Sequence, residues 1–393
     1  MKPVEADAFA AAAAAYVHIP FCASVCPYCD FAVVAGRDDL AERYVSALCD
    51  EIASSEPWRP LETVYLGGGT PSHIDPSLLG RAVDALASRH GIVSGAEISL
   101  EANPEDFEPE RALRLRQIGF NRVSFGAQSF ESGVLRSLGR RHGPAEIERS
   151  VAAAREAGFQ NVSLDLIYGT PGEADWVGSL ERALALGPDH VSCYALTVER
   201  GTPLGRAVSE GAAAPDPDVQ ASDYRLAEDR LGEAGYARYE VSNWARPGFE
   251  CRYNLTVWAQ GEYLAFGNGA HGHRHGIRYR NIRRIDAYLA AVERGEMPRA
   301  GEEEVSGWAA EVDRLFVGLR RDVGVLPGEG GAVLLESEDG KRLVEAGVLA
   351  VVEGRLRVEK PLLGDEVLRA VVGLDPPKLR ENTVGADIVS TDA

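Results

Sequence analysis

Residues 16–29 read YVHIPFCASVCPYC, a stretch that brings Cys22, Cys26 and Cys29 within eight residues of one another. Three thiolates on one short loop can ligate three irons of a 4Fe–4S cubane and leave the fourth iron open to another ligand. A zinc site is the alternative, but it needs a fourth ligand nearby, and His18 is the only close candidate. The spacing therefore favours an iron–sulfur cluster.

The other three cysteines, Cys49, Cys193 and Cys251, are scattered and are most simply buried thiols. A secreted disulfide framework usually spreads paired cysteines through a short chain, so this pattern indicates a reducing compartment with a metal site. The alanine-rich stretch 9–15 lacks the apolar core of a signal peptide, and no run of 18 apolar residues exists. We therefore expect a cytoplasmic protein without a transmembrane segment.

The composition limits both the size of the fold and its partners. The chain has 393 residues, 45% of them hydrophobic, which predicts two domains or one large α/β domain with an appendage. It carries 41 Lys and Arg against 60 Asp and Glu, a formal charge of −19. Phosphate would be repelled over most of such a surface, so we expect no nucleic-acid partner.

Short strand-like runs recur along the first half of the chain, with helical stretches between them. The runs cover 14–18, 63–66, 97–100, 122–125, 161–167 and 190–196, and the helical stretches cover 40–52, 78–89, 109–118, 145–157 and 180–185. This alternation predicts a parallel sheet with helices on its outside. Six such units can form a curved, incomplete (β/α)6 barrel or a flat doubly wound sheet, and spacing alone does not separate the two.

Unusual residues follow the ends of these strands. They read GGGTP at 67–71, EANP at 101–104, GAQS at 126–129 and GTPG at 169–172. The carboxyl ends of parallel strands meet at one mouth, where α/β proteins place their active sites. The glycine triplet also allows a ligand to approach the backbone closely, because no Cβ intervenes. The sequence thus predicts one shared site near the cysteines.

From about residue 200 the alternation weakens. Residues 201–218 read as a loop, 224–234 as a helix and 236–241 as a strand. Beyond residue 298 short helices accompany two β-like pieces at 349–352 and 356–358, which predicts a small helical domain with a wing. Residues 376–393 contain few apolar side chains and are expected to be disordered.

The cysteine triplet with its flanks and the GGGTP segment resemble the radical S-adenosylmethionine (SAM) proteins. The resemblance is specifically to the family of oxygen-independent coproporphyrinogen III dehydrogenase and its heme-chaperone relatives, and it runs from Tyr16 to about Val371. It implies a radical SAM core at 12–235, a linking segment at 236–298 and a winged C-terminal domain at 299–375. In that family the three cysteines hold the cluster, and the amino and carboxylate groups of SAM chelate the fourth iron.

The resemblance also implies which residues bind the cofactors. By this match Tyr16, Gly68 and Glu101 contact SAM on the cluster. The adjoining cofactor or substrate cavity is matched by Tyr28, Gly69, Thr70, Gln128, Arg140, Asp165 and Ala195. These residue types suit SAM, since carboxylates accept hydrogen bonds from an ammonium and from ribose hydroxyls, and a guanidinium can pair with a carboxylate.

Two departures distinguish the members of that family. The dehydrogenases carry a fourth cysteine where this chain has Phe31, and the form without it is typical of the chaperones. The chaperones carry an HNxxYW motif, which here reads YNLTVW at 253–258. Tyr253 thus replaces the histidine and Val257 the tyrosine. A histidine is a natural ligand of heme iron, so the exchange bears directly on heme binding.

Two candidates for a heme ligand follow. Tyr253 could ligate ferric heme as a phenolate. Downstream, His271, His273 and His275 alternate, and on an extended segment they would share one face. That spacing suits a metal or heme, with a histidine-rich surface loop as the alternative; we take Tyr253 and His271 as the candidates.

The sequence therefore predicts a heme chaperone that binds heme, a 4Fe–4S cluster and SAM and transfers heme to an acceptor protein. One alternative is an enzyme that decarboxylates coproporphyrinogen III oxidatively by a 5′-deoxyadenosyl radical; the other is a radical SAM enzyme acting on an unrelated substrate. Catalytic residues, the acceptor and the oligomeric state do not follow from the sequence.

Overall fold

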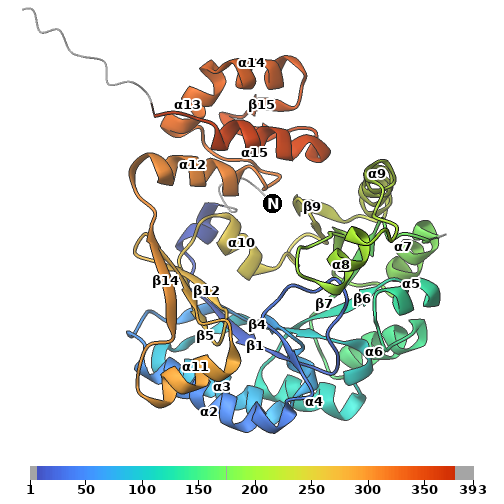
Figure 1. Cartoon of the computed structure of the whole chain (residues 1–393), viewed down its shortest axis with the longest axis vertical. Coiled ribbons are helices and arrows are strands. Elements are labelled where there is room, and N and C mark those ends of the chain that lie inside the picture. The colour runs from blue at the N-terminus through green and yellow to red at the C-terminus, as the bar shows by residue number, and fades with distance from the viewer. Residues whose placement is uncertain (1–6, 174, 377–393) are drawn as a thin grey trace, which may run out of the picture.

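One curved sheet forms the body of the molecule in the computed structural model, which describes residues 7–173 and 175–376 (Figure 1). Its parallel part follows chain order in hydrogen-bonded neighbours. These strands are β1 (Ala14–Ile19), β4 (Leu61–Gly68), β5 (Ile92–Ala102), β6 (Arg122–Gln128), β7 (Asn161–Tyr168) and β8 (His190–Ala195). All six predicted strands are thus present, each within a few residues of its expected limits.

Further strands extend the sheet at both ends. On the β1 side, β11 (Tyr263–Phe266) pairs in parallel, followed by antiparallel β12 (His271–Arg274), β13 (Ile277–Asn281) and β14 (Arg299–Glu304). On the β8 side lie antiparallel β10 (Asn243–Ala245) and β9 (Ala237–Glu240). Within the described residues β14 and β9 are the two edges and do not pair, so the barrel is open. The predicted incomplete barrel is confirmed over the flat sheet.

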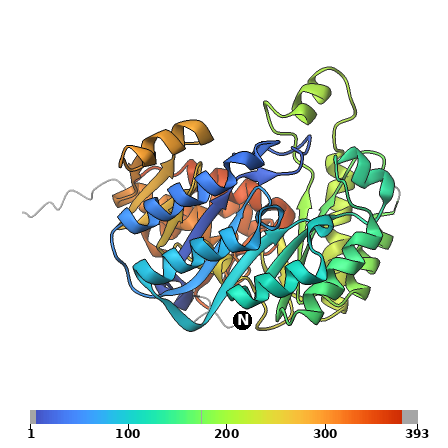
Figure 2. The same cartoon turned by 90° about the horizontal axis from the view of Figure 1, so that it is seen from below.

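The predicted helices cover the convex face of the sheet (Figures 1 and 2). They are α2 (Ala41–Ser54), α3 (Pro76–His90), α4 (Pro109–Ile118), α6 (Pro144–Glu156), α7 (Trp176–Ala185) and α9 (Pro217–Glu233). Strand residues alternate between the two faces, so Val123 and Phe125 of β6 are fully buried in the apolar core. Their neighbours Arg122 and Ser124 point to the concave side, where they line a cavity.

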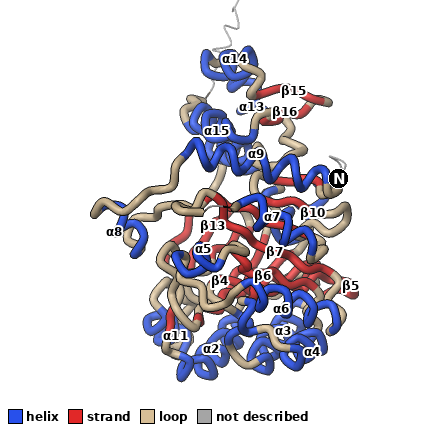
Figure 3. The backbone as a smooth tube through the Cα atoms, turned by 90° about the vertical axis from the view of Figure 1, so that its right-hand side faces the viewer, coloured by secondary structure: helices blue, strands red, loops and turns tan. Residues whose placement is uncertain are grey.

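Two shorter helices differ in where they lie. Helix α10 (Arg252–Trp258) packs on β1 and β4 inside the barrel. Helix α8 (Pro203–Ser209) stands out from the rest of the molecule (Figure 3). The prediction of a loop over 201–218 is wrong there, because Thr202 caps α8 by accepting a hydrogen bond from the Gly205 amide at 3.0 Å. Asp216 caps α9 in the same way and starts that helix earlier than expected.

A second apolar core lies beyond β14. It consists of α12 (Gly307–Gly318), α13 (Gly328–Glu336), α14 (Glu338–Glu345), β15 (Leu349–Val352), β16 (Arg355–Val358) and α15 (Gly364–Val372). The antiparallel β15–β16 hairpin is the predicted wing. Since β14 still pairs with β13, we propose that the small domain begins at α12, slightly after the expected residue 299.

The tail expected to be disordered, 376–393, lies outside the described residues except for its first position. Among the described residues, no helix has the length and apolarity needed to cross a bilayer.

Candidate functional site

The three cysteines lie on one loop that leaves the carboxyl end of β1. Strand β2 (Phe21–Cys22) pairs with β3 (Val34–Ala35), which closes the loop at its base. All three thiols are free and partly exposed. The Thr70 hydroxyl donates to the Cys22 sulfur at 3.5 Å, which connects this loop to the segment after β4.

The protonation state of Cys22 is informative about what the loop can hold. Burial raises the pKa of this thiol to about 11, with a smaller opposing effect from the Thr70 hydrogen bond. Burial also raises the pKa of Cys29. Thiols of this kind become thiolates when a metal ion or cluster displaces the proton. The donor set therefore fits a metal group better than a reactive free thiolate.

His18, the fourth ligand that a zinc site would require, is engaged elsewhere. Its Nδ1 lies 3.0 Å from the Tyr16 hydroxyl and its Nε2 lies 3.0 Å from the Ala32 carbonyl oxygen. Both ring nitrogens are thus occupied, which removes the only nearby candidate for zinc. Among the described residues, no three His, Cys, Asp or Glu side chains converge as ligands of a single metal ion. A cubane makes no such demand, because its thiolates bind different irons.

The glycine triplet after β4 brings the chain close to itself. Gly68 has φ +107°, and a Cβ there would lie 2.2 Å from the His18 ring. A Cβ on Gly69 would lie 2.7 Å from the backbone of Pro20. The sequence predicts that the triplet admits a ligand. The structure gives a more immediate reason for the glycines, because β4 packs here on the segment that leads into the cysteine loop.

Glu101, at the end of β5, lies directly under this turn. Its carboxylate accepts hydrogen bonds from the Gly68 amide at 2.9 Å and the Tyr65 hydroxyl at 3.0 Å. Burial raises the pKa of Glu101 to about 7, although these two hydrogen bonds oppose the shift. This carboxyl group can therefore gain or lose its proton near neutral pH.

Two further polar groups from later strands face the same space. The Ser124 hydroxyl lies 3.0 and 3.1 Å from the two carboxylate oxygens of Asp165, and burial raises the pKa of that carboxyl group. Gln128 ends β6 at a bulge with φ 65°, a left-handed conformation that is uncommon outside glycine. The bulge turns the Gln128 side chain toward the cavity, where strained residues often belong to sites.

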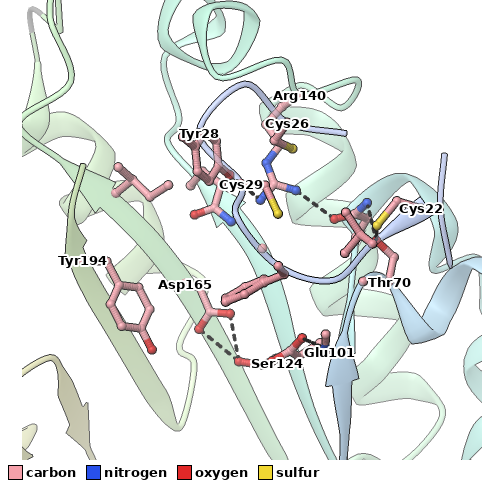
Figure 4. Close-up of a pocket in the computed structure, with 18 of the residues that line it drawn as sticks. Cys22, Cys26, Tyr28, Cys29, Thr70, Glu101, Ser124, Arg140, Asp165 and Tyr194 are labelled. Carbon is pink, nitrogen blue, oxygen red and sulfur yellow. Dashed lines mark hydrogen bonds between the residues drawn. The ribbon is translucent and has the colours of Figure 1, made fainter. Parts of the chain in front are cut away.

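Arg140 spans the side of the cavity nearest the cysteines (Figure 4). Its guanidinium donates to the Asn103 amide oxygen at 2.9 Å and to the Tyr28 hydroxyl at 2.8 Å. Its Nε atom has no hydrogen-bond partner among the described residues. The Leu204 amide donates to the Pro27 carbonyl at 2.8 Å, so the first turn of α8 supports the cysteine loop from outside.

These groups surround one cavity of about 470 Å³. Twelve of the residues expected at the site line it: Cys22, Cys26, Cys29, Tyr28, Gly68, Gly69, Thr70, Glu101, Gln128, Arg140, Asp165 and Ala195. Tyr16 does not line the cavity. Its ring stacks on the ring of Tyr65, which does line the cavity, and the two ring centroids are 6.3 Å apart.

The two heme candidates lie in different environments. The Tyr253 ring is inside the barrel, 5.2 Å from the Tyr65 ring and 6.0 Å from the Tyr16 ring. Burial raises the pKa of Tyr253 well above its usual value, so a phenolate is disfavoured. His271 is exposed on β12; partial burial, with Arg280 and Arg283 nearby, lowers its pKa and keeps the imidazole neutral.

The predicted shared face of three histidines holds for only two of them. His271 and His273 both belong to β12, two positions apart. His275 lies in the following turn with φ 55°, so the strand alternation no longer applies to it. Its backbone amide donates to Glu262, not toward the other histidines.

Sequence reasoning missed several lining residues, chiefly on β6 and β8. They are Arg122, Ser124, His190, Ser192 and Tyr194, together with Asn254 of α10. A signal was available in β6, since Arg122, Ser124, Gly126 and Gln128 alternate with apolar residues. Three polar side chains and a glycine at every second position of a core strand indicate that one face lines a polar space.

Comparison with known proteins agrees with this geometry. Residues 16–182 match the family model described as the radical SAM superfamily. The solved structure of coproporphyrinogen III oxidase HemN from Escherichia coli, a radical SAM enzyme, superposes with a TM-score of 0.78 at 22% identity. The superposition covers 94% of this chain and 92% of that one. Fold and match together define the class of radical SAM proteins, which implies a 4Fe–4S cluster and SAM.

Closer relatives narrow the assignment. The heme chaperone HemW of Mycobacterium tuberculosis is 40% identical over 378 residues, covering 91% of this chain and 94% of the relative. HemW of Bacillus subtilis is 33% identical over 374 residues, which cover 91% of this chain and 99% of that relative. The chain belongs to the family of the heme chaperone HemW.

Proposed function

We propose that this protein is a heme chaperone, which binds heme and transfers it to an acceptor protein while holding a 4Fe–4S cluster and SAM. Cys22, Cys26 and Cys29 would hold the cluster, and the groups around Glu101, Asp165 and Arg140 would hold SAM. The observation that carries the proposal is the 40% identity over 91% of the chain to a relative named as a heme chaperone.

The chemistry of the cavity supports the cofactor part of this proposal. Three free thiols open onto the same space as the carboxyl groups of Glu101 and Asp165 and the guanidinium of Arg140. The sulfonium and ammonium of SAM would find carboxylates, and its carboxylate would find a cationic fork. When bound, the cluster and SAM supply one-electron chemistry at the sulfonium; the chain's own residues bind and orient them.

For the heme iron we propose His271 in preference to Tyr253. A neutral, exposed imidazole is ready to ligate, and the lowered pKa of His271 keeps it in that form. Tyr253 would have to lose a proton that its surroundings hold tightly, since burial raises its pKa. It would also have to leave the ring stack with Tyr16 and Tyr65.

The dehydrogenase reaction is the second candidate, because the structure shares its fold with HemN. Against it stands Phe31, which occupies the place of the fourth cysteine and is 65% exposed on the cysteine loop. A radical SAM enzyme with another substrate is the third possibility.

Anaerobic reconstitution with iron and sulfide separates these proposals. The wild type should gain broad absorbance near ~400 nm, bind SAM and hemin, and lose bound heme to an apo-acceptor, without turning over coproporphyrinogen III. Cys22→Ala, Cys26→Ala and Cys29→Ala should each lose the cluster absorbance. Cys49→Ala is the matched control, because Cys49 lies on α2 and its thiol faces the Arg81 carbonyl.

Two results would contradict the proposal. Recovery of zinc in place of iron and sulfide would remove the cluster and with it the cofactor assignment. Turnover of coproporphyrinogen III without heme binding would make the dehydrogenase the better description.

A further inference from the structure

Arg122 is a buried cation whose hydrogen bonds are not all made. It is the first residue of β6 and only 2% exposed, and it lines the cavity at the end farthest from the cysteine loop. Its Nε and Nη1 atoms have no hydrogen-bond partner among the described residues. A guanidinium cannot discharge by losing its proton, so burying it with unmade bonds costs free energy unless another group compensates.

The carboxyl groups near Arg122 are already occupied by other donors. Glu97 accepts from the Arg252 amide at 3.0 Å and lies 3.8 Å from the Cys251 sulfur. Glu101 accepts from Tyr65 and Gly68, and Asp165 accepts from Ser124. Burial raises the pKa of all three carboxyl groups, although the charge of Arg122 opposes that shift in each of them. These groups therefore compensate part of the Arg122 charge through space, while the Nε and Nη1 hydrogen bonds stay unmade among the described residues.

The remaining neighbour, His190, adds no second charge. Its Nδ1 lies 2.8 Å from the Ser163 hydroxyl and its Nε2 lies 2.8 Å from the Tyr239 hydroxyl. Burial and the nearby Arg122 lower its pKa well below the usual value, so the ring is neutral. Arg122 is therefore the single cation facing this end of the cavity within the described residues that line it. Arg140 bonds Tyr28 beside the cysteine loop, and Arg141 follows it directly in the chain (Figure 4).

We propose that the end of the cavity at Arg122 is a subsite for a carboxylate group of the molecule that occupies the barrel. A carboxylate carries the single negative charge that a guanidinium complements, and its oxygens can accept a hydrogen bond from Nε or from Nη1. A phosphate carries more charge and would face the carboxyl groups of Glu97, Glu101 and Asp165. The inference deepens the proposed function in one respect: a heme propionate is one source of such a carboxylate, and a small carboxylic acid is another.

Arg122→Met tests the subsite, because it keeps most of the side-chain length and removes the charge and the donors. In the ligand-free protein the thermal midpoint should change little, because Nε and Nη1 make no hydrogen bond among the described residues that the substitution would break. A purely structural arginine would give a clear fall in the midpoint. Arg122→Lys keeps the charge but not the guanidinium donors, so its affinity for a carboxylate should lie between those of the wild type and Arg122→Met. Arg114→Met, on the outer surface of α4, is the matched control.

Sodium propionate is the first probe, titrated against sodium chloride at equal ionic strength. It should raise the midpoint of the wild type and of Arg114→Met in a saturable way and leave Arg122→Met unchanged. Hemin and its dimethyl ester, in which both propionates are esterified, identify the source. If heme supplies the carboxylate, the wild type should bind hemin about 10- to 100-fold more tightly than the ester, and Arg122→Met should bind the two alike.

Each outcome decides between the two proposals. An equal propionate effect in the wild type and in Arg122→Met would overturn the subsite, as would a large loss of stability in Arg122→Met alone. A propionate effect without discrimination between hemin and its ester keeps the subsite and assigns it to a small carboxylic acid. A wild type that binds no hemin but responds to propionate through Arg122 contradicts the chaperone proposal and supports the subsite.

Discussion

Glu101 shows how a single side chain connects the strands to the proposed cofactor site. Its two acceptor bonds fix the turn at Gly68 and the ring of Tyr65. Substituting Gly68 would disturb more than a ligand, because a Cβ there meets the His18 ring at 2.2 Å. Glu101→Gln is the cleaner change, since the amide keeps the size and one acceptor oxygen.

The first prediction concerns SAM affinity as a function of pH. Burial raises the pKa of Glu101 to about 7, so the carboxylate that would accept from SAM is lost as the pH falls below 7. We expect the wild-type affinity to fall by up to about tenfold per pH unit below that value. Glu101→Gln should bind SAM about 1–3 kcal/mol more weakly at pH 8 and show a flatter profile. Calorimetric titration of the two reconstituted proteins with SAM measures these affinities. The same dependence of SAM affinity on pH in the wild type and in Glu101→Gln would remove Glu101 from the SAM site.

At the scale of elements, the sequence pattern predicted those strands and faces that depend on neighbouring residues alone. The six strands follow from apolar runs between helical stretches, and the polar inner face of β6 follows from a period of two. Helix α8 could not be anticipated in this way. Its seven residues are placed by the Thr202 cap and by contact of Leu204 with Pro27, which is far away in the chain. Likewise, nothing local indicated that the Tyr253 ring stacks on Tyr16 and Tyr65.

The Glu51 side chain connects helix α2 to α11, to β13 and to the turn after β11. Its buried carboxylate accepts from the Tyr288 hydroxyl of α11 (Ile285–Glu293) at 2.6 Å, from the Gly267 amide at 2.8 Å and from the Asn281 side chain at 2.7 Å. Burial nevertheless dominates and raises the pKa of Glu51 to about 7. The folded protein thus holds the proton more tightly than the unfolded chain, where the pKa is ordinary.

The second prediction follows from this sign. Below about pH 4.5 the carboxyl group is protonated in both states; as the pH rises toward 7 only the unfolded chain loses the proton, and folding stability falls. The Glu51 contribution to this fall is about 3 kcal/mol between pH 4.5 and 7. Glu51→Gln cannot titrate, so its unfolding free energy should change less over this interval. Denaturant titrations of both proteins at pH 5 and 7.5 give their unfolding free energies. An equal change of unfolding free energy between the two pH values in both proteins would contradict the assignment.

At the scale of the whole molecule, the N-terminal segment connects the barrel to the small domain. Asp7 lies beside Arg355, with hydrogen bonds of 2.7 and 3.0 Å, and beside Arg321 at 3.0 Å. Burial alone would raise the pKa of Asp7, but the bonds and charges of Arg355 and Arg321 outweigh it and lower the pKa. Both arginines are more than 90% buried and sit in or next to the small domain.

The third prediction is that Asp7→Asn loosens this junction. Two buried guanidinium groups would lose their anion, and we expect a loss of about 1–3 kcal/mol at pH 7. The loss should be smaller than for a fully buried pair, because Asp7 is 39% exposed. Limited proteolysis should also cut sooner between β14 and α12. Glu293→Gln breaks an exposed pair with Arg43 and should leave both measurements nearly unchanged; equal behaviour of the two variants would contradict a role of Asp7 at the junction.

The last prediction concerns the heme ligand, on which the chaperone proposal depends most. A neutral imidazole ligates ferric and ferrous iron alike, whereas a phenolate favours ferric iron because it carries charge. With the pKa of His271 lowered and that of Tyr253 raised, we expect His271→Ala to lose the heme Soret signature in both oxidation states and Tyr253→Phe to keep it. His273→Ala is the matched control, because the His273 ring is held against the Gly261 carbonyl. Loss of the ferric complex in Tyr253→Phe alone would assign the iron to the phenolate instead. If the wild type and both variants show no specific heme binding, the barrel serves another substrate. The carboxylate subsite at Arg122 then becomes the best guide to the chemistry of that substrate.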